Sequence, residues 1–191
     1  MKISTSELLD ELKNRTAQHL SFAETLSVKS ESDLNFRASE DSWSVLECLE
    51  HLNRYGDFYI PEINRNISSA EKSSQPYFKP GILGNYFANS MLPKEKLNKM
   101  KTLKTMNPIH SQLNKNVIDK FIRQQEQLLK LLEEARHVDL GKVKTGVSIS
   151  KLIKLKLGDT FRFVIYHNER HILQIKRILT HKKEDMISKK V

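Results

Sequence analysis

Two histidines near residue 170 are the clearest chemical signal in the sequence. His167 and His171 are separated by Asn168, Glu169 and Arg170. On a helix, residues at this spacing project from one face, with their Cβ atoms roughly 6 Å apart. Both imidazoles can then approach one cation at the roughly 2.0–2.1 Å of a zinc–nitrogen bond. The spacing therefore predicts part of a metal site.

A metal site needs a further donor, and His51 is the best candidate. It lies beside Leu52 on a predicted amphipathic helix, from which its side chain can turn toward the interior. Three neutral imidazoles suit Zn²⁺, Ni²⁺ or Fe²⁺ and leave positions for water or substrate. The chain lacks the zincin motif H-E-x-x-H, because Asn168 follows the first histidine of the pair. A solvated histidine pair without a metal is the alternative.

Glu47 and Arg170 are candidate catalytic residues. Glu47 precedes His51 by four residues, so it could accept a hydrogen bond from a ligand imidazole or hold a metal-bound water. Its alternative role is a capping box with Ser44. Arg170 could face a substrate carboxylate or lie on the surface. Cys48 is expected to be a small buried hydrophobic residue rather than a metal ligand.

Five more polar or aromatic residues are considered as possible neighbours of the site. Trp43 is predicted to pack on the first turn of its helix, and Tyr55 and Tyr59 are predicted to be core residues. His19 is expected at the edge of the first helix rather than in the site. Gln174 either lines the rim of a pocket or is exposed.

Hydrophobic periodicity predicts an all-α four-helix bundle that would carry these residues. The expected helices run from Ser4 to Leu26, from Ser44 to about Tyr59, from Asn114 to Arg136, and from Asp159 or Thr160 to about 181. Pro61 is expected to kink or end the second helix. Residues 62–111 are predicted to form a surface excursion or lid, with helical turns near Leu83–Met91 and a basic run from Lys94 to Lys104. The sequence has no alternating Val/Ile/Thr run, which indicates a mostly helical protein.

Length and composition indicate one globular domain over 1–181, followed by a frayed basic tail at 182–191. The chain has 191 residues, of which 38% are hydrophobic and 29% charged. One cysteine excludes an intrachain disulfide and a cysteine-rich zinc module. No segment has the roughly 18 apolar residues of a membrane span, and the N-terminus lacks a signal-peptide core, so we expect a cytoplasmic protein.

The net charge of +9 raises nucleic acid as a partner. The lysines are scattered, however, and no RRM, KH or zinc-finger pattern accompanies them. Nucleic-acid binding is therefore disfavoured, and a small-molecule substrate is expected.

Two segments resemble the DinB/YfiT-like superfamily. In the first, Trp43-Ser44 is followed by Glu47 and then His51; in the second, residues 157–163 are followed by the histidine pair, Arg170 and Gln174. The order of elements also agrees over roughly residues 1–181. The resemblance implies a four-helix bundle that holds a divalent metal through three histidines, which by position are His51, His167 and His171.

The resemblance also implies an activity. Relatives include bacillithiol and mycothiol S-transferases and maleylpyruvate isomerase, which use a low-molecular-weight thiol, and many relatives are homodimers. The expected function is a metal-dependent S-transferase, in which the metal activates a thiol, with hydrolysis by a metal-bound water as a variant. A stress-response module that binds metal or a small ligand without catalysis is the main alternative, followed by a nucleic-acid-binding bundle.

Overall fold

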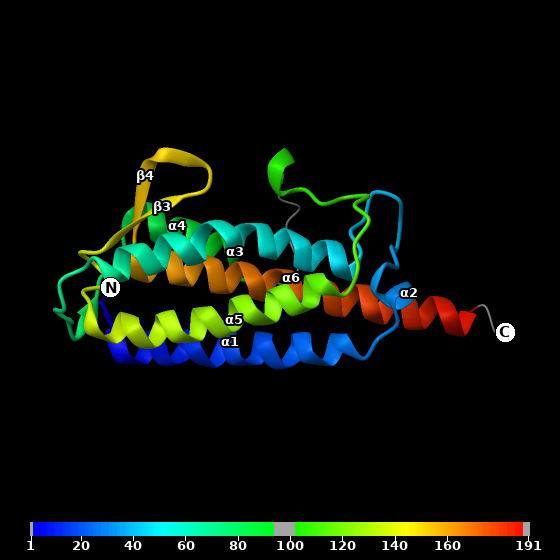
Figure 1. The fold of residues 1–191 in the computed structure, drawn as a ribbon, viewed down its shortest axis with the longest axis horizontal. Coiled ribbons are helices and arrows are strands. Elements are labelled where there is room, and N and C mark those ends of the chain that lie inside the picture. Colours follow the sequence, from blue (N-terminus) through cyan, green and yellow to red (C-terminus); the bar gives the residue numbers. More distant parts are fainter. Residues whose placement is uncertain (1, 94–101, 189–191) are drawn as a thin grey trace.

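A computed structural model describes residues 2–93 and 102–188. Within this part of the chain, four long helices lie side by side: α1 (Thr5–Ser27), α3 (Val45–Ser68), α5 (Asn116–Glu134) and α6 (Leu157–Ser188) (Figure 1). Helix α1 packs against α5 and α6, and α3 packs against the same two helices. The predicted all-α four-helix bundle is confirmed.

Two of the four predicted helix starts, at Ser4 and Ser44, have side-chain hydrogen bonds that cap the helix. The Ser4 hydroxyl accepts from the backbone N–H of Glu7 at the start of α1. At the start of α3, the Glu47 N–H donates to the Ser44 hydroxyl (3.2 Å) and the Ser44 N–H donates to the Glu47 carboxylate (2.8 Å). This reciprocal capping box satisfies two N–H groups that a helix start leaves unpaired.

The interior is divided into two apolar clusters with polar side chains between them. One cluster includes Leu12, Ile63 and Phe161, and the other includes Leu49 and Ile175. The polar side chains buried along the helices between the clusters are Thr16, His19, His51, Asn53, Gln124, Gln125, His167, Asn168, Arg170 and His171. Buried polar groups cost free energy unless they find partners, so this polar layer is where a functional site is expected.

The second long helix is longer than predicted. Helix α3 continues through Pro61 to Ser68, so Pro61 does not end it, and the excursion begins at Ser69 rather than at residue 62. Pro61 is exposed on the outer face of the helix. The chain then pairs β2 (Tyr77–Phe78) with β1 (Ile3–Ser4) and forms α4 (Ile82–Met91), where helical turns were predicted. Most of the lysine run lies outside the described residues.

Other short helices complete the connections between the long ones. They are α2 (Glu31–Leu34), the 3₁₀ turn η1 (Lys104–Met106) and the 3₁₀ turn η2 (Ala135–His137). Helix α6 continues to Ser188, so most of the region 182–191 that was predicted to be a frayed tail is helical.

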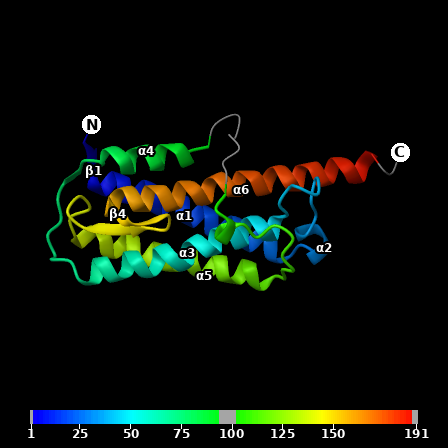
Figure 2. The same cartoon turned by 90° about the horizontal axis from the view of Figure 1, so that it is seen from above.

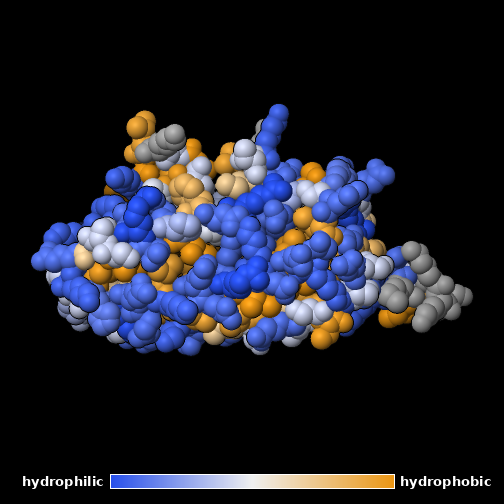
Figure 3. Space-filling view, in the orientation of Figure 1, coloured by the Kyte–Doolittle hydropathy of each residue, from blue (hydrophilic) through white to orange (hydrophobic). Residues whose placement is uncertain are grey.

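A short β-hairpin, which the sequence pattern did not predict, precedes α6 in this mostly helical fold. Strands β3 (Lys144–Val147) and β4 (Ser150–Lys156) pair antiparallel, and Thr145 opposite Leu155 is buried on the inner face. The hairpin and η1 both lie over α3 and α6 (Figure 2). In the orientation of Figure 1, hydrophilic side chains cover most of the visible face, while apolar side chains gather at the hairpin, where Ile149 and Leu152 are exposed (Figure 3).

Candidate metal centre

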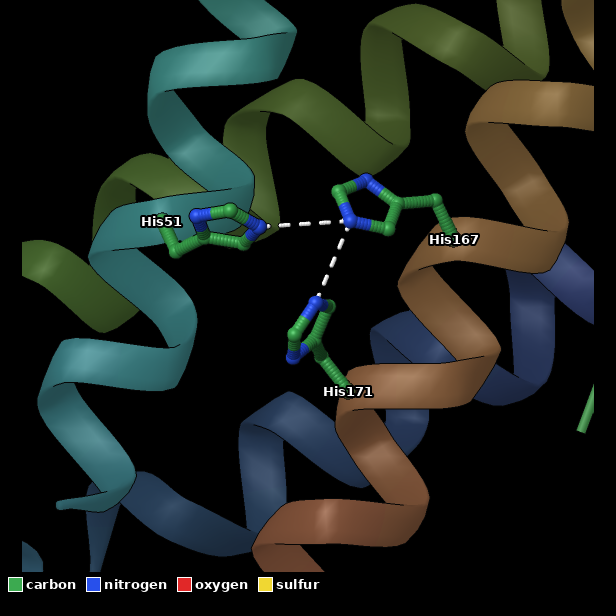
Figure 4. A group of neighbouring side chains, drawn as sticks. All are labelled: His51, His167 and His171. Carbon is green, nitrogen blue, oxygen red and sulfur yellow. Dashed lines mark hydrogen bonds between the residues drawn. The ribbon is translucent and has the colours of Figure 1, made fainter. Parts of the chain in front are cut away.

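Three histidines from two helices converge in the bundle. His51 extends from α3, and His167 and His171 extend from neighbouring turns of α6 (Figure 4). The Nε2 atom of His167 lies 3.2 Å from that of His51 and 3.1 Å from that of His171. All three side chains are buried, with at most 9% of their surface exposed. The structure therefore brings together the three residues that the sequence predicted as ligands.

Two of the three nitrogen–nitrogen spacings match those of ligands around one cation. Two nitrogens bound to one ion at 2.0–2.1 Å, with an angle between 90° and the tetrahedral value, lie roughly 2.9–3.4 Å apart. The two Nε2–Nε2 distances fall in this range. One nitrogen from each residue lies within 4.8 Å of the others. The group can therefore hold a metal ion.

Hydrogen bonds on the far side of two rings leave their Nε2 atoms as donors to a metal. His51 Nδ1 lies 2.7 Å from the backbone oxygen of Met106, and His171 Nδ1 lies 2.9 Å from the side-chain oxygen of Gln174. Because both partners are acceptors, we assign the ring proton to Nδ1 in both residues. Their Nε2 lone pairs then point at the same region as His167 Nε2, which can donate a proton to only one of them. A cation would satisfy all three.

Burial keeps these imidazoles neutral. Removal from water lowers the pKa of His51 to about 4 and the pKa of His171 to about 3, and it lowers the pKa of His167 well below the usual value. The positive charges that the three rings would carry also disfavour one another's protonation. Neutral rings with free lone pairs are the form that binds a metal.

Aromatic rings surround the histidines. The Trp43 ring stacks beside His171, with ring centroids 5.6 Å apart, and the Tyr55 centroid is 4.6 Å from that of His167. Phe163 also stacks on His167, with ring centroids 5.9 Å apart. Trp43 and Tyr55 each pack against an apolar cluster, as predicted, and both also contact the histidines. Tyr55 and Phe163 are half-buried, so they form a partly accessible wall of the site.

The Glu47 carboxylate serves the helix start. Arg37 donates to both carboxylate oxygens, at 2.9 and 2.5 Å, and the Ser44 N–H donates to one of them. Burial by itself raises the pKa of Glu47, but the hydrogen bonds from Arg37 and Ser44 lower it below its ordinary value. Of the two predicted roles, the capping role is the one that the structure shows.

Three other predicted residues have defined positions. Arg170 is buried rather than on the surface, and its positive charge helps to lower the pKa of both His167 and His171. Cys48 is fully buried, and burial raises its pKa, so it is a neutral thiol in the core. His19 is not at an exposed helix edge: it is 4% exposed, and its Nδ1 has no hydrogen-bond partner among the described residues.

The sequence interpretation missed two supports of the site. Gln174 was considered for the pocket rim, yet its side chain orients His171. The spacing of three residues along α6 is the signal that could have shown this contact. Met106 supports His51 through its backbone oxygen, and every residue type has such an oxygen, so the sequence gives no signal for this contact.

Comparison with known families agrees with this arrangement. The family model of the DinB superfamily matches residues 8–175, a range that contains all three histidines. The chain belongs to the DinB superfamily. No curated protein and no solved structure gives a significant match. A DinB-like bundle with a three-histidine group is compatible with metal binding. No described helix is both long enough and apolar enough to span a membrane, as the sequence predicted.

Proposed function

We propose that this DinB-like protein is a metal-dependent S-transferase with His51, His167 and His171 as the metal ligands. The observation that carries the proposal is the convergence of three buried histidines, in which His167 Nε2 lies at ligand spacing from the Nε2 atoms of the other two. The Nδ1-protonated tautomers of His51 and His171 support it, because each ring then presents a lone pair rather than a proton at Nε2. Zn²⁺, Ni²⁺ and Fe²⁺ all accept three imidazoles and an open position.

The composition of the group favours a thiol over a water as the nucleophile. Among the described residues, the group consists of three histidines and contains no Asp or Glu. Hydrolysis benefits from a carboxylate that takes a proton from the attacking water, and Glu47 is already paired with Arg37. A divalent ion supplies positive charge that lowers the pKa of a nearby thiol, which is about 8.5 when free. A low-molecular-weight thiol is therefore the proposed cosubstrate.

The surrounding residues would assist the transfer in two ways. Arg170 adds a buried positive charge whose field reaches His167 and His171, and that field favours a thiolate over a thiol. Tyr55 and Phe163 offer half-buried rings against which an apolar electrophile can pack and exclude water. The thiolate sulfur then forms a bond to the electrophilic carbon, the leaving group departs with its electron pair, and the thiol proton passes to solvent.

Elemental analysis of purified variants tests the metal site. The wild-type protein is expected to retain close to one divalent ion per chain, and His51→Ala, His167→Ala and His171→Ala are expected to lose it. His19→Ala is the matched control, because His19 is also a buried histidine but lies outside the group. Full metal retention in all three variants would refute the assignment.

A kinetic assay tests the transfer. Metal-loaded protein is incubated with bacillithiol, mycothiol or glutathione and a generic electrophile such as 1-chloro-2,4-dinitrobenzene. Turnover that disappears in the histidine variants and persists in His19→Ala supports the S-transferase. Stoichiometric metal binding without turnover by any of these thiols favours the non-catalytic binding module instead.

A further inference from the structure

A short segment far from α3 in the sequence supports His51. The backbone oxygen of Met106 accepts the 2.7 Å hydrogen bond from His51 Nδ1, although the two residues are 55 positions apart. Met106 belongs to the three residues Thr105–Asn107, which we call the site turn. The site turn lies partly in η1, within the excursion and between α4 and α5.

Two side chains hold the site turn: Arg54 from α3 and Trp43 from the residues before that helix. The Arg54 Nη1 atom lies 3.2 Å from the backbone oxygen of Thr105 and 3.2 Å from that of Asn107. These two carbonyls flank Met106, so one guanidinium fixes both ends of the peptide unit that faces His51. Trp43 Nε1 also donates to the Asn107 side-chain oxygen at 3.1 Å.

The two holding residues are themselves positioned. Arg54 Nε donates to the Glu50 carboxylate at 2.9 Å, an i, i+4 pair on α3, and Arg54 is 29% exposed at its side chain. The Trp43 ring lies 4.7 Å from the His51 ring, so Trp43 contacts both the histidine and the turn that orients it. A guanidinium with planar, directed donors suits two carbonyl acceptors better than a single ammonium group does.

We propose that Arg54 and Trp43 are positioning residues that act through the site turn to keep the His51 proton on Nδ1. The two neutral tautomers of a histidine are close in energy, so one good hydrogen bond decides between them. In the other tautomer the proton would occupy Nε2, the atom that faces the other histidines. The inference rests on the proposed metal function only for its consequence, which is a higher metal affinity.

The primary test uses the metal-free protein and therefore does not depend on the metal proposal. Long-range ¹H–¹⁵N NMR spectra of the imidazole nitrogens distinguish a protonated Nδ1 from a protonated Nε2 in each histidine. Arg54→Ala is expected to shift His51 from the Nδ1–H form toward a mixture, and Trp43→Phe is expected to give a smaller shift because the ring remains. His171, held by Gln174, should keep its tautomer in both variants.

Arg65→Ala is the matched control. Arg65 also lies on α3 and pairs with a glutamate on the same helix, Glu62, but it is exposed and does not contact the site turn. It should leave the His51 spectrum unchanged. An unchanged His51 tautomer in Arg54→Ala, with the fold intact by circular dichroism, would overturn the proposal.

Metal affinity supplies the second readout. Outer-sphere partners of a ligand typically contribute 10–100-fold to metal affinity. Competition with a chromophoric chelator should show a Zn²⁺ affinity at least 10-fold weaker in Arg54→Ala than in Arg65→Ala. If Arg54→Ala shifts the His51 tautomer but the wild-type protein binds no metal, the positioning role stands and the metal function is refuted. Equal affinities despite a tautomer shift would overturn the claimed consequence for metal binding.

Discussion

Helix α6 carries two buried polar clusters, and they differ in how completely their groups are paired. Near its start, Asp159 and Arg162 face each other at 3.2 Å. The Asp159 carboxylate also accepts the N–H of Gly81 at 2.7 Å, and Arg162 donates to the side-chain oxygens of Asn85 and Asn89. Two turns later, His167 and His171 meet His51 in a group that, among the described residues, includes no Asp or Glu.

The difference separates a structural cluster from a candidate functional one. In the Asp159–Arg162 cluster, charges and donors are matched by partners from α4, so the cluster attaches α4 to α6. In the histidine cluster, three Nε2 atoms converge with one proton to share among them, and an added cation would complete it. Buried polar groups that are fully paired serve the fold, whereas those that lack a partner point to a ligand.

Breaking the matched cluster should have the largest effect. Arg162→Met leaves the Asp159 carboxylate buried without its cation, which is expected to lower the free energy of unfolding by about 3–5 kcal/mol. Urea denaturation followed by circular dichroism measures the change. Metal content per folded chain should not change. A loss below about 1 kcal/mol would show that the pair behaves like an exposed one. Asp159→Asn combined with Arg162→Met should recover part of the stability.

The histidine cluster should instead respond to a cation. With free Zn²⁺ at 100 times its dissociation constant, the wild-type free energy of unfolding is expected to rise by about 2.7 kcal/mol. His171→Ala should show little of this gain at the same metal concentration, while Arg162→Met should keep it. Thermal unfolding with and without Zn²⁺ measures the difference. Equal stabilisation of the wild type and His171→Ala would contradict a role of His171 in binding.

Acid should separate the two clusters by the sign of their effect. The folded pKa of His171, about 3, lies below the ordinary value of about 6.5. Between these values the unfolded chain binds more protons, so the metal-free protein loses stability as the pH falls, by up to about 1.4 kcal/mol per pH unit for this residue. Asp159 has a raised pKa because it is buried, so its contribution is lost as the pH rises.

Equilibrium unfolding between pH 7 and pH 4.5 tests this difference. His171→Asn should make the decline in stability toward acid shallower than in the metal-free wild type. An identical slope in the two proteins would mean that His171 does not have the depressed pKa that its burial indicates.

The smallest expected effect comes from Cys48, a buried cysteine that belongs to neither polar cluster. Cys48→Ala is expected to cost about 1 kcal/mol through the small cavity that it leaves. Metal affinity should be unchanged, because Cys48 is not part of the three-histidine group. The native protein should also resist a thiol reagent such as Ellman's reagent, since the thiol is buried and its pKa is raised. Rapid labelling of folded protein would show an accessible thiol.

Local patterns in the sequence predicted the elements that carry the site. The spacing of His167 and His171 places both on one helical face, and the Ser44–Glu47 capping box sets the start of the helix that carries His51. These features depend on contacts within one helical turn, which sequence spacing encodes directly. They were sufficient for the bundle and for the choice of candidate ligands.

Features that depend on distant contacts were missed. The hairpin at 144–156 alternates buried and exposed residues over only a few positions, and Gly146 and Ser148 interrupt the pattern. Pro61 is tolerated within α3 because its ring lies on the exposed face. The Met106 carbonyl reaches His51 across 55 positions. In each case tertiary packing, rather than local preference, decides the outcome.

His51 and His167 are separated by 116 positions in the chain. An ion shared by them would be a reversible cross-link between two helices that local folding cannot bring together. Closing a loop of that length restricts the unfolded chain much as a long-range disulfide does. Loss of the ion to a chelator would thus do more than stop chemistry: it would release the tie between α3 and α6 and make their separation easier under heat, force or a protease.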